Sequence, residues 1–261
     1  MVTIRLVTFD VLHTLITPRH PVHVQYSLAF APYLGRLDPQ DIKNSFKKGW
    51  RTISESSHII NSVAALKALQ QERPAYAYEN GAASERWWSE VIRRTAVGAG
   101  ANPSAIDGSL DKIVPTLMRS FSSREGYAAF EDALPTIRQL HEKKVFTAVV
   151  SNSDSRSRLV LKDLEFPENV TPIVLSEEEG VEKPSRELFH RALKRVNEIH
   201  GLDIQEDECL HVGDELECDY EGAVKAGMQG LLLRRPGAEE DEVELKNVRT
   251  IQSLKQVVEY V

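Results

Sequence analysis

Five side chains that could do chemistry follow short apolar segments of this sequence. Asp10 follows "IRLVTF" and Ser151 follows "VFTAVV", whereas Asp214 comes shortly after "CLHV" and has Asp219 close behind it. Lys183 follows an acidic loop after "PIVL". A carboxylate can attack an electrophile or bind a divalent cation, and a hydroxyl group and an ammonium group can contact an anion. Taken alone, Asp10 could initiate a turn, Ser151 and Asp219 could cap helices, and Lys183 could be a surface residue, but together these residues indicate a phosphate and metal site.

The apolar segments themselves are typical of strands in a parallel sheet. They cover residues 4–9, 145–150, 172–175, 209–212 and 230–235, and helix-like segments separate them from residue 130 onward. One such segment, "SRELFHRALKRVNEI", has Pro184 before it and a helical apolar repeat. The alternation predicts an α/β fold with a doubly wound parallel sheet, in which ligands bind at the carboxyl ends of the strands.

Residues 18–125 differ from the rest of the chain because they contain no convincing strand. Their patterns predict helices at 22–34, 38–57, 62–72, 84–97 and 104–122. We therefore expect a core built from residues 1–17 and 126–261, with 18–125 inserted as a helical domain. The acidic run at 238–244 is interpreted as a solvated loop.

Composition narrows the class of protein. The 261-residue chain has a net charge of -7, so it lacks the basic excess that binds nucleic acid or anionic membranes nonspecifically. No apolar run is long enough to span a bilayer, and a strand-like segment begins at residue 2, where a signal peptide would lie. Cys209 and Cys218 have neither metal-ligand spacing nor the number expected of a disulfide framework. The sequence predicts an intracellular, by default cytoplasmic, protein with a small phosphorylated ligand, and leaves its oligomeric state open.

Four motifs resemble those of the haloacid dehalogenase (HAD) superfamily of hydrolases. They are "FDVLHTL", "VVSNS", "EKPS" and "VGDELECD". The longer segments "KPSRELFHRAL" and "HVGDELECDYEGAVKAGM" resemble the rhythmically-expressed-gene-2 branch, also called HAD-like hydrolase domain-containing 3 proteins. The resemblance covers residues 2–16 and about 130–235, and it implies a Rossmann-like core with an inserted helical cap.

The resemblance also implies the roles of the site residues. Asp10 would attack phosphorus to form an aspartyl-phosphate, which divides one difficult displacement into two easier ones. Mg2+ would be held by the carboxylates of Asp10 and Asp214 and by the main-chain carbonyl of Leu12, because this hard ion prefers oxygen ligands. Asp219 would support the metal shell or the lysine.

Substrate contacts are expected from the remaining motif residues. Ser151 would donate a hydrogen bond to a phosphate oxygen, and Lys183 would offset the negative charge around the transferring group. The substrate-binding set would comprise Thr14, Ser151, Asn152 and Lys183.

Leu12 departs from the pattern of the superfamily's phosphatases, which usually have a second aspartate at this position. Leucine cannot protonate the leaving group, and loss of general acid–base assistance typically slows catalysis about 100-fold to 10,000-fold. His13 is the obvious substitute, but its neighbouring position on a tight loop should direct it elsewhere.

Three alternatives to a phosphohydrolase remain open. The superfamily's dehalogenases also lack the second aspartate, but their fourth motif resembles Ser-Ser-Asn rather than Gly-Asp. Phosphonate hydrolysis would require a Schiff-base lysine from the cap, and nothing around the available lysines marks one as desolvated. The chain could also be a binding or scaffolding protein that has lost turnover with Leu12. The lysines considered are Lys47, Lys48 and Lys67, and the most distinctive cap residues are Trp50, Arg51, Trp87 and Trp88.

Overall fold

The computed structural model describes residues 2–47, 82–237 and 247–261, and the chain divides into two compact units. One unit contains residues 1–17 and 128–261, and the other contains residues 18–127. Each unit is described by itself below.

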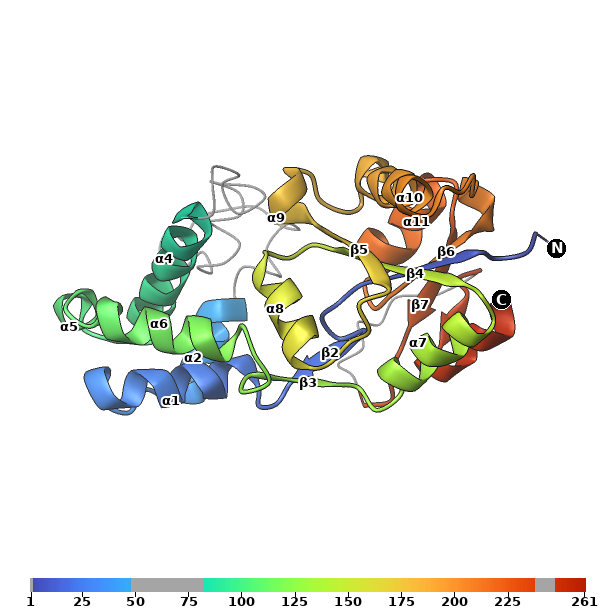
Figure 1. The fold of residues 1–261 in the computed structure, drawn as a ribbon. Helices are drawn as coiled ribbons and strands as arrows, with labels where there is room; N and C mark the ends of the chain where they lie inside the picture. Colours follow the sequence, from blue (N-terminus) through green and yellow to red (C-terminus); the bar gives the residue numbers. More distant parts are fainter. Residues whose placement is uncertain (1, 48–81, 238–246) are drawn as a thin grey trace, which may run out of the picture. The chain divides into compact units, whose positions relative to one another are not determined.

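The first unit is built on a six-stranded sheet whose strands all pair in parallel (Figure 1). The strand order is β5-β4-β1-β6-β7-β8. The predicted doubly wound parallel fold is confirmed, and the five predicted strands are present within two residues at each end. The short edge strand β8 was not predicted. The strands are β1 Leu6–Phe9, β4 Phe146–Ser151, β5 Val170–Leu175, β6 Cys209–Gly213, β7 Gln229–Leu233 and β8 Thr250–Ile251.

Helices cover both faces of this sheet, with α10 and α11 on one face and α7 on the other (Figure 1). The longest, α10, begins after Ser185, whose side chain accepts a hydrogen bond from the Glu187 main-chain N–H, and it ends at Gly201 in the left-handed conformation. The helical elements are α7 Ala133–Glu142, α8 Arg156–Asp163, α9 Ser176–Glu179, α10 Arg186–His200, α11 Gly222–Lys225, the 3-10 helices η2 Glu206–Glu208 and η4 Leu254–Tyr260, and the π-helix η3 Leu216–Glu221.

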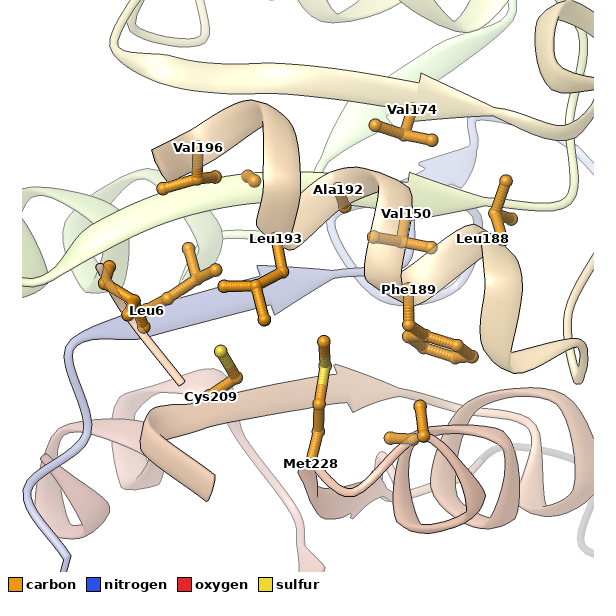
Figure 2. Close-up of a cluster of buried hydrophobic side chains, with 14 residues drawn as sticks. Leu6, Val150, Val174, Leu188, Phe189, Ala192, Leu193, Val196, Cys209 and Met228 are labelled. Atoms are coloured by element: carbon orange, nitrogen blue, oxygen red, sulfur yellow. The ribbon is translucent and has the colours of Figure 1, made fainter. Parts of the chain in front are cut away.

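The apolar face of α10 packs onto the sheet to form the core of the first unit (Figure 2). Leu188, Phe189, Ala192 and Val196 are fully buried at helical spacing. They contact buried strand residues, which are Leu6, Ala148, Val150, Val174 and Cys209. The buried Cys209 thiol is a packing residue, and its burial raises its pKa to about 12.

The second unit is helical in the part of it that the structure describes. Its helices are α1 Val22–Leu34, α2 Pro39–Lys47, α4 Ala82–Gly98, α5 Pro103–Asp107 and α6 Leu110–Ser120. They share an apolar core that includes Tyr26, Phe30, Ile92, Ile113 and Leu117. No strand of the central sheet lies within the described residues 22–47 and 82–122, whereas the predicted helix at 62–72 falls outside the described residues.

The single helix predicted over residues 104–122 is wrong, because the chain forms two helices there. The Gly108 main-chain N–H donates to Ser104 O and ends α5. The Ser109 carbonyl then accepts from the N–H groups of Lys112 and Ile113, which begins a second helix.

Two three-residue strands, β2 Ile16–Pro18 and β3 Tyr127–Ala129, form a separate two-stranded sheet. They lie where the chain leaves and re-enters the first unit. Across the described ranges, none of the helices has the length and apolar character needed to cross a membrane.

Candidate active site

The strand order brings the ends of three strands together. β1 lies between β4 and β6, and the chain crosses to the other side of β1 between β5 and β6. In open α/β sheets, ligands bind outside the carboxyl ends of the strands at such a switch point. Asp10 follows β1, Ser151 ends β4, and Asp214 follows β6, so the structure brings these residues to one edge as predicted.

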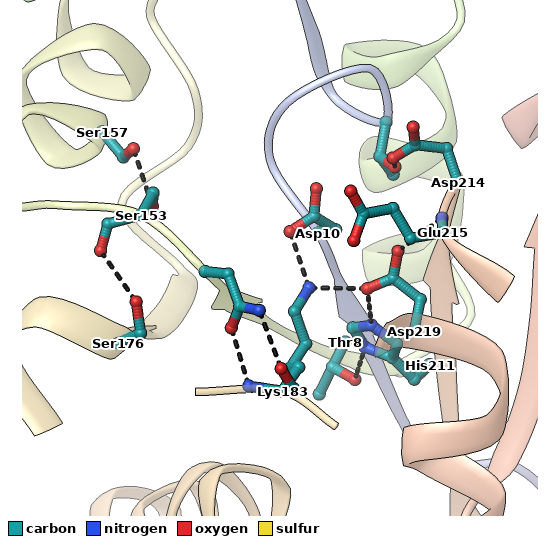
Figure 3. Close-up of polar contacts among 12 residues, drawn as sticks. Thr8, Asp10, Ser153, Ser157, Ser176, Lys183, His211, Asp214, Glu215 and Asp219 are labelled. Atoms are coloured by element: carbon teal, nitrogen blue, oxygen red, sulfur yellow. Dashed lines mark hydrogen bonds and ion pairs between the residues drawn. The ribbon is translucent and has the colours of Figure 1, made fainter. Parts of the chain in front are cut away.

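Lys183 joins two of the acidic residues at this edge (Figure 3). Its Nζ lies 2.7 Å from Asp10 Oδ1 and 2.6 Å from Asp219 Oδ1, and the lysine is only 3% exposed. Burial opposes the charged form, but the two carboxylates raise the pKa of Lys183 above its usual range. The two carboxylates therefore favour the charged ammonium group and hold it beside Asp10.

Asp219 is placed by a π-helical turn that follows β6. This turn returns the Asp219 side chain to the end of the strand, where its Oδ2 accepts from the Glu215 main-chain N–H at 2.9 Å. A Cβ at Gly213 would lie 2.1 Å from Asp219 Cγ, so only glycine fits there. Although burial opposes its ionisation, Lys183 and His211 hold the pKa of Asp219 well below its usual range.

A buried pair inside the strands, Thr8 and His211, extends this network beneath the site (Figure 3). His211 Nε2 lies 3.0 Å from Asp219 Oδ1, and its Nδ1 lies 2.8 Å from Thr8 Oγ1. Because a carboxylate only accepts, Nε2 carries a proton, and burial lowers the pKa of His211, so Nδ1 accepts from Thr8. Sequence reasoning missed both residues because they lie inside the strands, whereas the candidates were sought after the strand ends.

Asp214 completes a cluster of carboxylates. One oxygen each from Asp10, Asp214 and Asp219 lies within 4.8 Å of the others. Burial and the charges of Asp10, Asp219 and Glu215 raise the pKa of Asp214 to about 8. Glu215 was not singled out from the sequence, yet its side chain extends from the end of β6 toward Asp10 (Figure 3). Burial, Asp219 and Asp10 raise its pKa as well.

The predicted substrate-binding residues are all at this edge, but two of them bond to other site residues. Thr14 is fully buried, and its hydroxyl lies 3.4 Å from Asp214 Oδ1. Asn152 Nδ2 donates to the Lys183 carbonyl at 2.9 Å, and Asn152 Oδ1 accepts from the Lys183 N–H at 2.7 Å. Ser151 is buried at the end of β4. The side chain of Asn152 thus positions Lys183 in this structure.

The loop after β1 contains Leu12 at the position of the absent second aspartate. Its side chain is 39% exposed. His13 follows it with a left-handed φ of 60°, and its N–H donates to Ile16 O at 2.8 Å. Desolvation lowers the pKa of the His13 imidazole although Asp10 opposes this, and a neutral imidazole is a poor proton donor.

The distinctive residues of the second unit are only partly described. Trp87 is fully buried beside Val91, with Trp88 edge-on to it at a ring distance of 4.9 Å, which is a packing arrangement. The residues Trp50, Arg51, Lys48 and Lys67 lie outside the described residues, as does the side chain of Lys47.

The geometry of the first unit can be compared with known proteins. A family model described as haloacid dehalogenase-like hydrolase matches residues 4–227. The chain belongs to this family.

Curated relatives in the HAD-like hydrolase family match most of the chain. The Haloacid dehalogenase-like hydrolase domain-containing protein 3 of Bos taurus is 29% identical over 233 residues, which cover 89% of this chain and 83% of the relative. The Rhythmically expressed gene 2 protein of Drosophila melanogaster is 24% identical, with coverages of 88% and 82%. The resemblance to this branch, expected from the motifs, is confirmed.

Solved structures confirm the HAD fold. A dehalogenase matches with a TM-score of 0.67 and 16% identity over 100% of this chain and 98% of its own. A HAD-hydrolase from Bacillus subtilis, determined bound to magnesium, matches with a TM-score of 0.60 and 18% identity over 98% of both chains. Because this fold is shared by proteins with different chemistry, the reaction must be argued from the site.

Proposed function

We propose that this HAD-like hydrolase is a Mg2+-dependent phosphohydrolase that acts on small phosphate esters through Asp10. The proposal is carried by one observation, which is the meeting of Asp10, Asp214 and Asp219 with a buried Lys183 at the end of β1. A nucleophilic carboxylate, oxygen ligands for a hard cation and a fixed positive charge are what phosphoryl transfer through an aspartyl-phosphate requires.

The residues at this edge fit a Mg2+ ion. Oxygen donors from Asp10 and Asp214 lie within a metal-binding distance of one another, whereas both oxygens of Asp219 already accept hydrogen bonds from protein groups. We therefore assign the first two as ligands, together with the Leu12 carbonyl, and Asp219 as a support. Burial and the charges of Asp10, Asp219 and Glu215 oppose ionisation of Asp214 and raise its pKa, and a divalent cation would offset these charges. When bound, Mg2+ would offset the charge of the phosphate.

The protein's own side chains account for the two chemical steps. A carboxylate oxygen of Asp10 attacks phosphorus, and the ester P–O bond breaks with its electron pair leaving on the alcohol oxygen, which takes a proton from solvent. Water then attacks the phosphorus of the aspartyl-phosphate, which releases inorganic phosphate and restores Asp10. Lys183 holds the Asp10 carboxylate in place, and Ser151 binds a phosphate oxygen.

The expected rate of phosphate ester hydrolysis depends on Leu12. The departing alkoxide receives no proton from this position, and the attacking water finds no base there. Turnover should therefore be slow for alkyl esters and faster for aryl esters, whose leaving groups need no protonation.

A catalytically silent binding protein is the second candidate, and the side chain at Leu12 is the observation that favours it. Dehalogenation is disfavoured by the motif at the end of β6. This chain has Gly213 and Asp214 there, whereas the corresponding motif of the superfamily's dehalogenases resembles Ser-Ser-Asn.

A screen of aryl and alkyl phosphates with Mg2+ tests the proposal. Wild type should hydrolyse an aryl phosphate, and both Asp10→Asn and chelation of the metal should abolish this activity. Asp203→Asn, which changes an exposed carboxylate before η2, should have no effect. If wild type binds Mg2+ and a phosphate analogue but shows no turnover that depends on Asp10, the binding protein replaces the phosphohydrolase.

A further inference from the structure

We infer that Arg234 and Arg235, which directly follow β7, are positioning residues. They hold the loops that carry Asp10 and Asp214 at the separation that a bound cation requires. The inference rests on the proposed function for the identity of the cation. Neither arginine belongs to the motifs of the sequence analysis, and each contacts the main chain of a different site loop.

Arg234 holds the loop after β6. Strands β6 and β7 are paired up to Gly213 and Leu232, so the end of β7 lies beside the start of the Asp214 loop. The Arg234 N–H donates to Ile251 O at 2.7 Å, which fixes its main chain, and its Nη1 donates to the main-chain carbonyl of Asp214. The guanidinium group thus fixes the backbone from which the Asp214 carboxylate extends.

Arg235 holds the loop after β1. Its Nη2 donates to the main-chain carbonyl of Thr14 at 2.9 Å. The same guanidinium group makes two hydrogen bonds to Asp132, at 3.0 and 2.9 Å, and lies 3.6 Å above the Phe130 ring. The Phe130 N–H in turn donates to Leu15 O at 3.0 Å. The Asp10 loop is therefore anchored at two consecutive carbonyls.

Hydrogen bonds fix the position of Asp132, so Asp132 holds the Arg235 guanidinium group in place. Its Oδ2 accepts from Ser253 Oγ at 2.7 Å and from the Leu254 N–H at 2.9 Å. Burial opposes ionisation of Asp132, but these hydrogen bonds and Arg235 lower its pKa below the usual value. Asp132 is only 7% exposed, and its hydrogen bonds hold the pair in one geometry.

Arginine has a geometric advantage at position 235, where one guanidinium group contacts both a carboxylate and a carbonyl. A planar guanidinium group can donate to a carboxylate in a bidentate manner and to a carbonyl at the same time, whereas a lysine ammonium group acts as a point charge. Thr14 links the two anchored loops directly, because its hydroxyl lies 3.4 Å from Asp214 Oδ1. Loss of either arginine should therefore alter the separation of Asp10 and Asp214.

Calorimetric titration of the full chain with Mg2+ alone tests the inference, with thermal melting of each variant measured in parallel. We expect Arg234→Lys and Arg235→Lys to weaken Mg2+ binding by about 10-fold to 100-fold, which is the usual effect of losing a group that orients a metal ligand. The corresponding methionine variants should bind more weakly still. Arg5→Lys is the matched control, because Arg5 pairs with Glu208 at the N-terminal ends of β1 and β6, away from the site, with an N–O distance of 3.3 Å.

The outcomes separate this inference from the proposed function. If the lysine variants melt earlier but bind Mg2+ as wild type does, the arginines are only structural and the inference is wrong. If wild type binds no Mg2+, the metal assignment fails and the inference fails with it. Weakened binding in the Arg234 and Arg235 variants, with unchanged binding in Arg5→Lys, supports both. If the Arg235 variants do not fold, Arg234→Lys decides the result, since Arg234 makes no ion pair among the described residues.

Discussion

The side-chain amide of Asn152 is paired with the main chain of Lys183 through one donated and one accepted hydrogen bond. These bonds fix the residue whose ammonium group reaches Asp10. Asn152→Leu should therefore displace Lys183, and we expect a loss of about 1–3 kcal/mol in the free energy of unfolding for the unpaired main-chain groups. Activity on an aryl phosphate should fall by at least about tenfold if Lys183 moves relative to Asp10.

Asn197 provides a matched control for Asn152. Its side chain makes the same pair of hydrogen bonds, at 3.0 and 2.9 Å, with the main chain of Ile204. Asn197→Leu should lower stability by a similar amount and leave the rate unchanged in the folded protein. Equal activity in the two variants would show that the contact of Asn152 with Lys183 is only structural.

The stability of the metal-free protein should depend on the ionisation of Asp214. Burial and the neighbouring carboxylates raise its pKa from 3.8 to about 8 on folding. The folded state then binds the proton more tightly than the unfolded state. The stabilising contribution is complete below about pH 4 and is lost as the pH rises toward about 8. Relative to Asp214→Asn, chelator-treated wild type should melt progressively earlier across this window.

Mg2+ should reverse this trend, because it binds the ionised form of Asp214. The increase in melting temperature caused by Mg2+ should grow across the same pH window in wild type and be smaller in Asp214→Asn. If Mg2+ raises the melting temperature of wild type and Asp214→Asn by the same amount at every pH, Asp214 is not a ligand of the metal.

Leu12→Asp should restore proton transfer to the leaving group. We expect a gain of at least about tenfold on alkyl phosphates, which corresponds to roughly 1.4 kcal/mol of barrier, and a smaller gain in the phosphoryl-transfer step with aryl phosphates. Leu12→Asn is the matched control, because it has the shape of aspartate without its acid–base chemistry. An equal gain in both variants would mean that the shape or polarity of the side chain causes the effect. If Leu12→Asp binds Mg2+ normally but gains no activity, the binding protein is favoured over the phosphohydrolase.

The sequence predicted the parts of the site that lie next to recognisable strands. Asp10, Ser151 and Asp214 are placed by the ends of β1, β4 and β6, and a parallel sheet brings such ends together. Lys183 is different, because its convergence on Asp10 depends on the path of the chain after β5. Its place at this edge was predicted from its position after the strand-like segment 172–175, whereas its role beside the nucleophile was expected from the motif resemblance.

The missed residues act through contacts that a local pattern does not encode. Thr8 and His211 occupy neighbouring strands, and their pairing follows from the register of β1 and β6, which aligns them directly. Arg235 meets Asp132 across 103 positions of the chain. The break at Gly108 was also missed, because the apolar repeat continues on both sides of it.

Pre-steady-state hydrolysis of an aryl phosphate tests the central claim most directly. An aryl leaving group departs without a proton, so formation of the aspartyl-phosphate should be fast, whereas its hydrolysis lacks a base at Leu12. We predict a burst of aryl alcohol close to one equivalent per enzyme in the presence of Mg2+. After acid quenching, mass spectrometry should find the phosphoryl group on the peptide that contains Asp10. Release of aryl alcohol by Asp10→Asn at the wild-type rate, or a phosphoryl group found on another residue, would contradict the account.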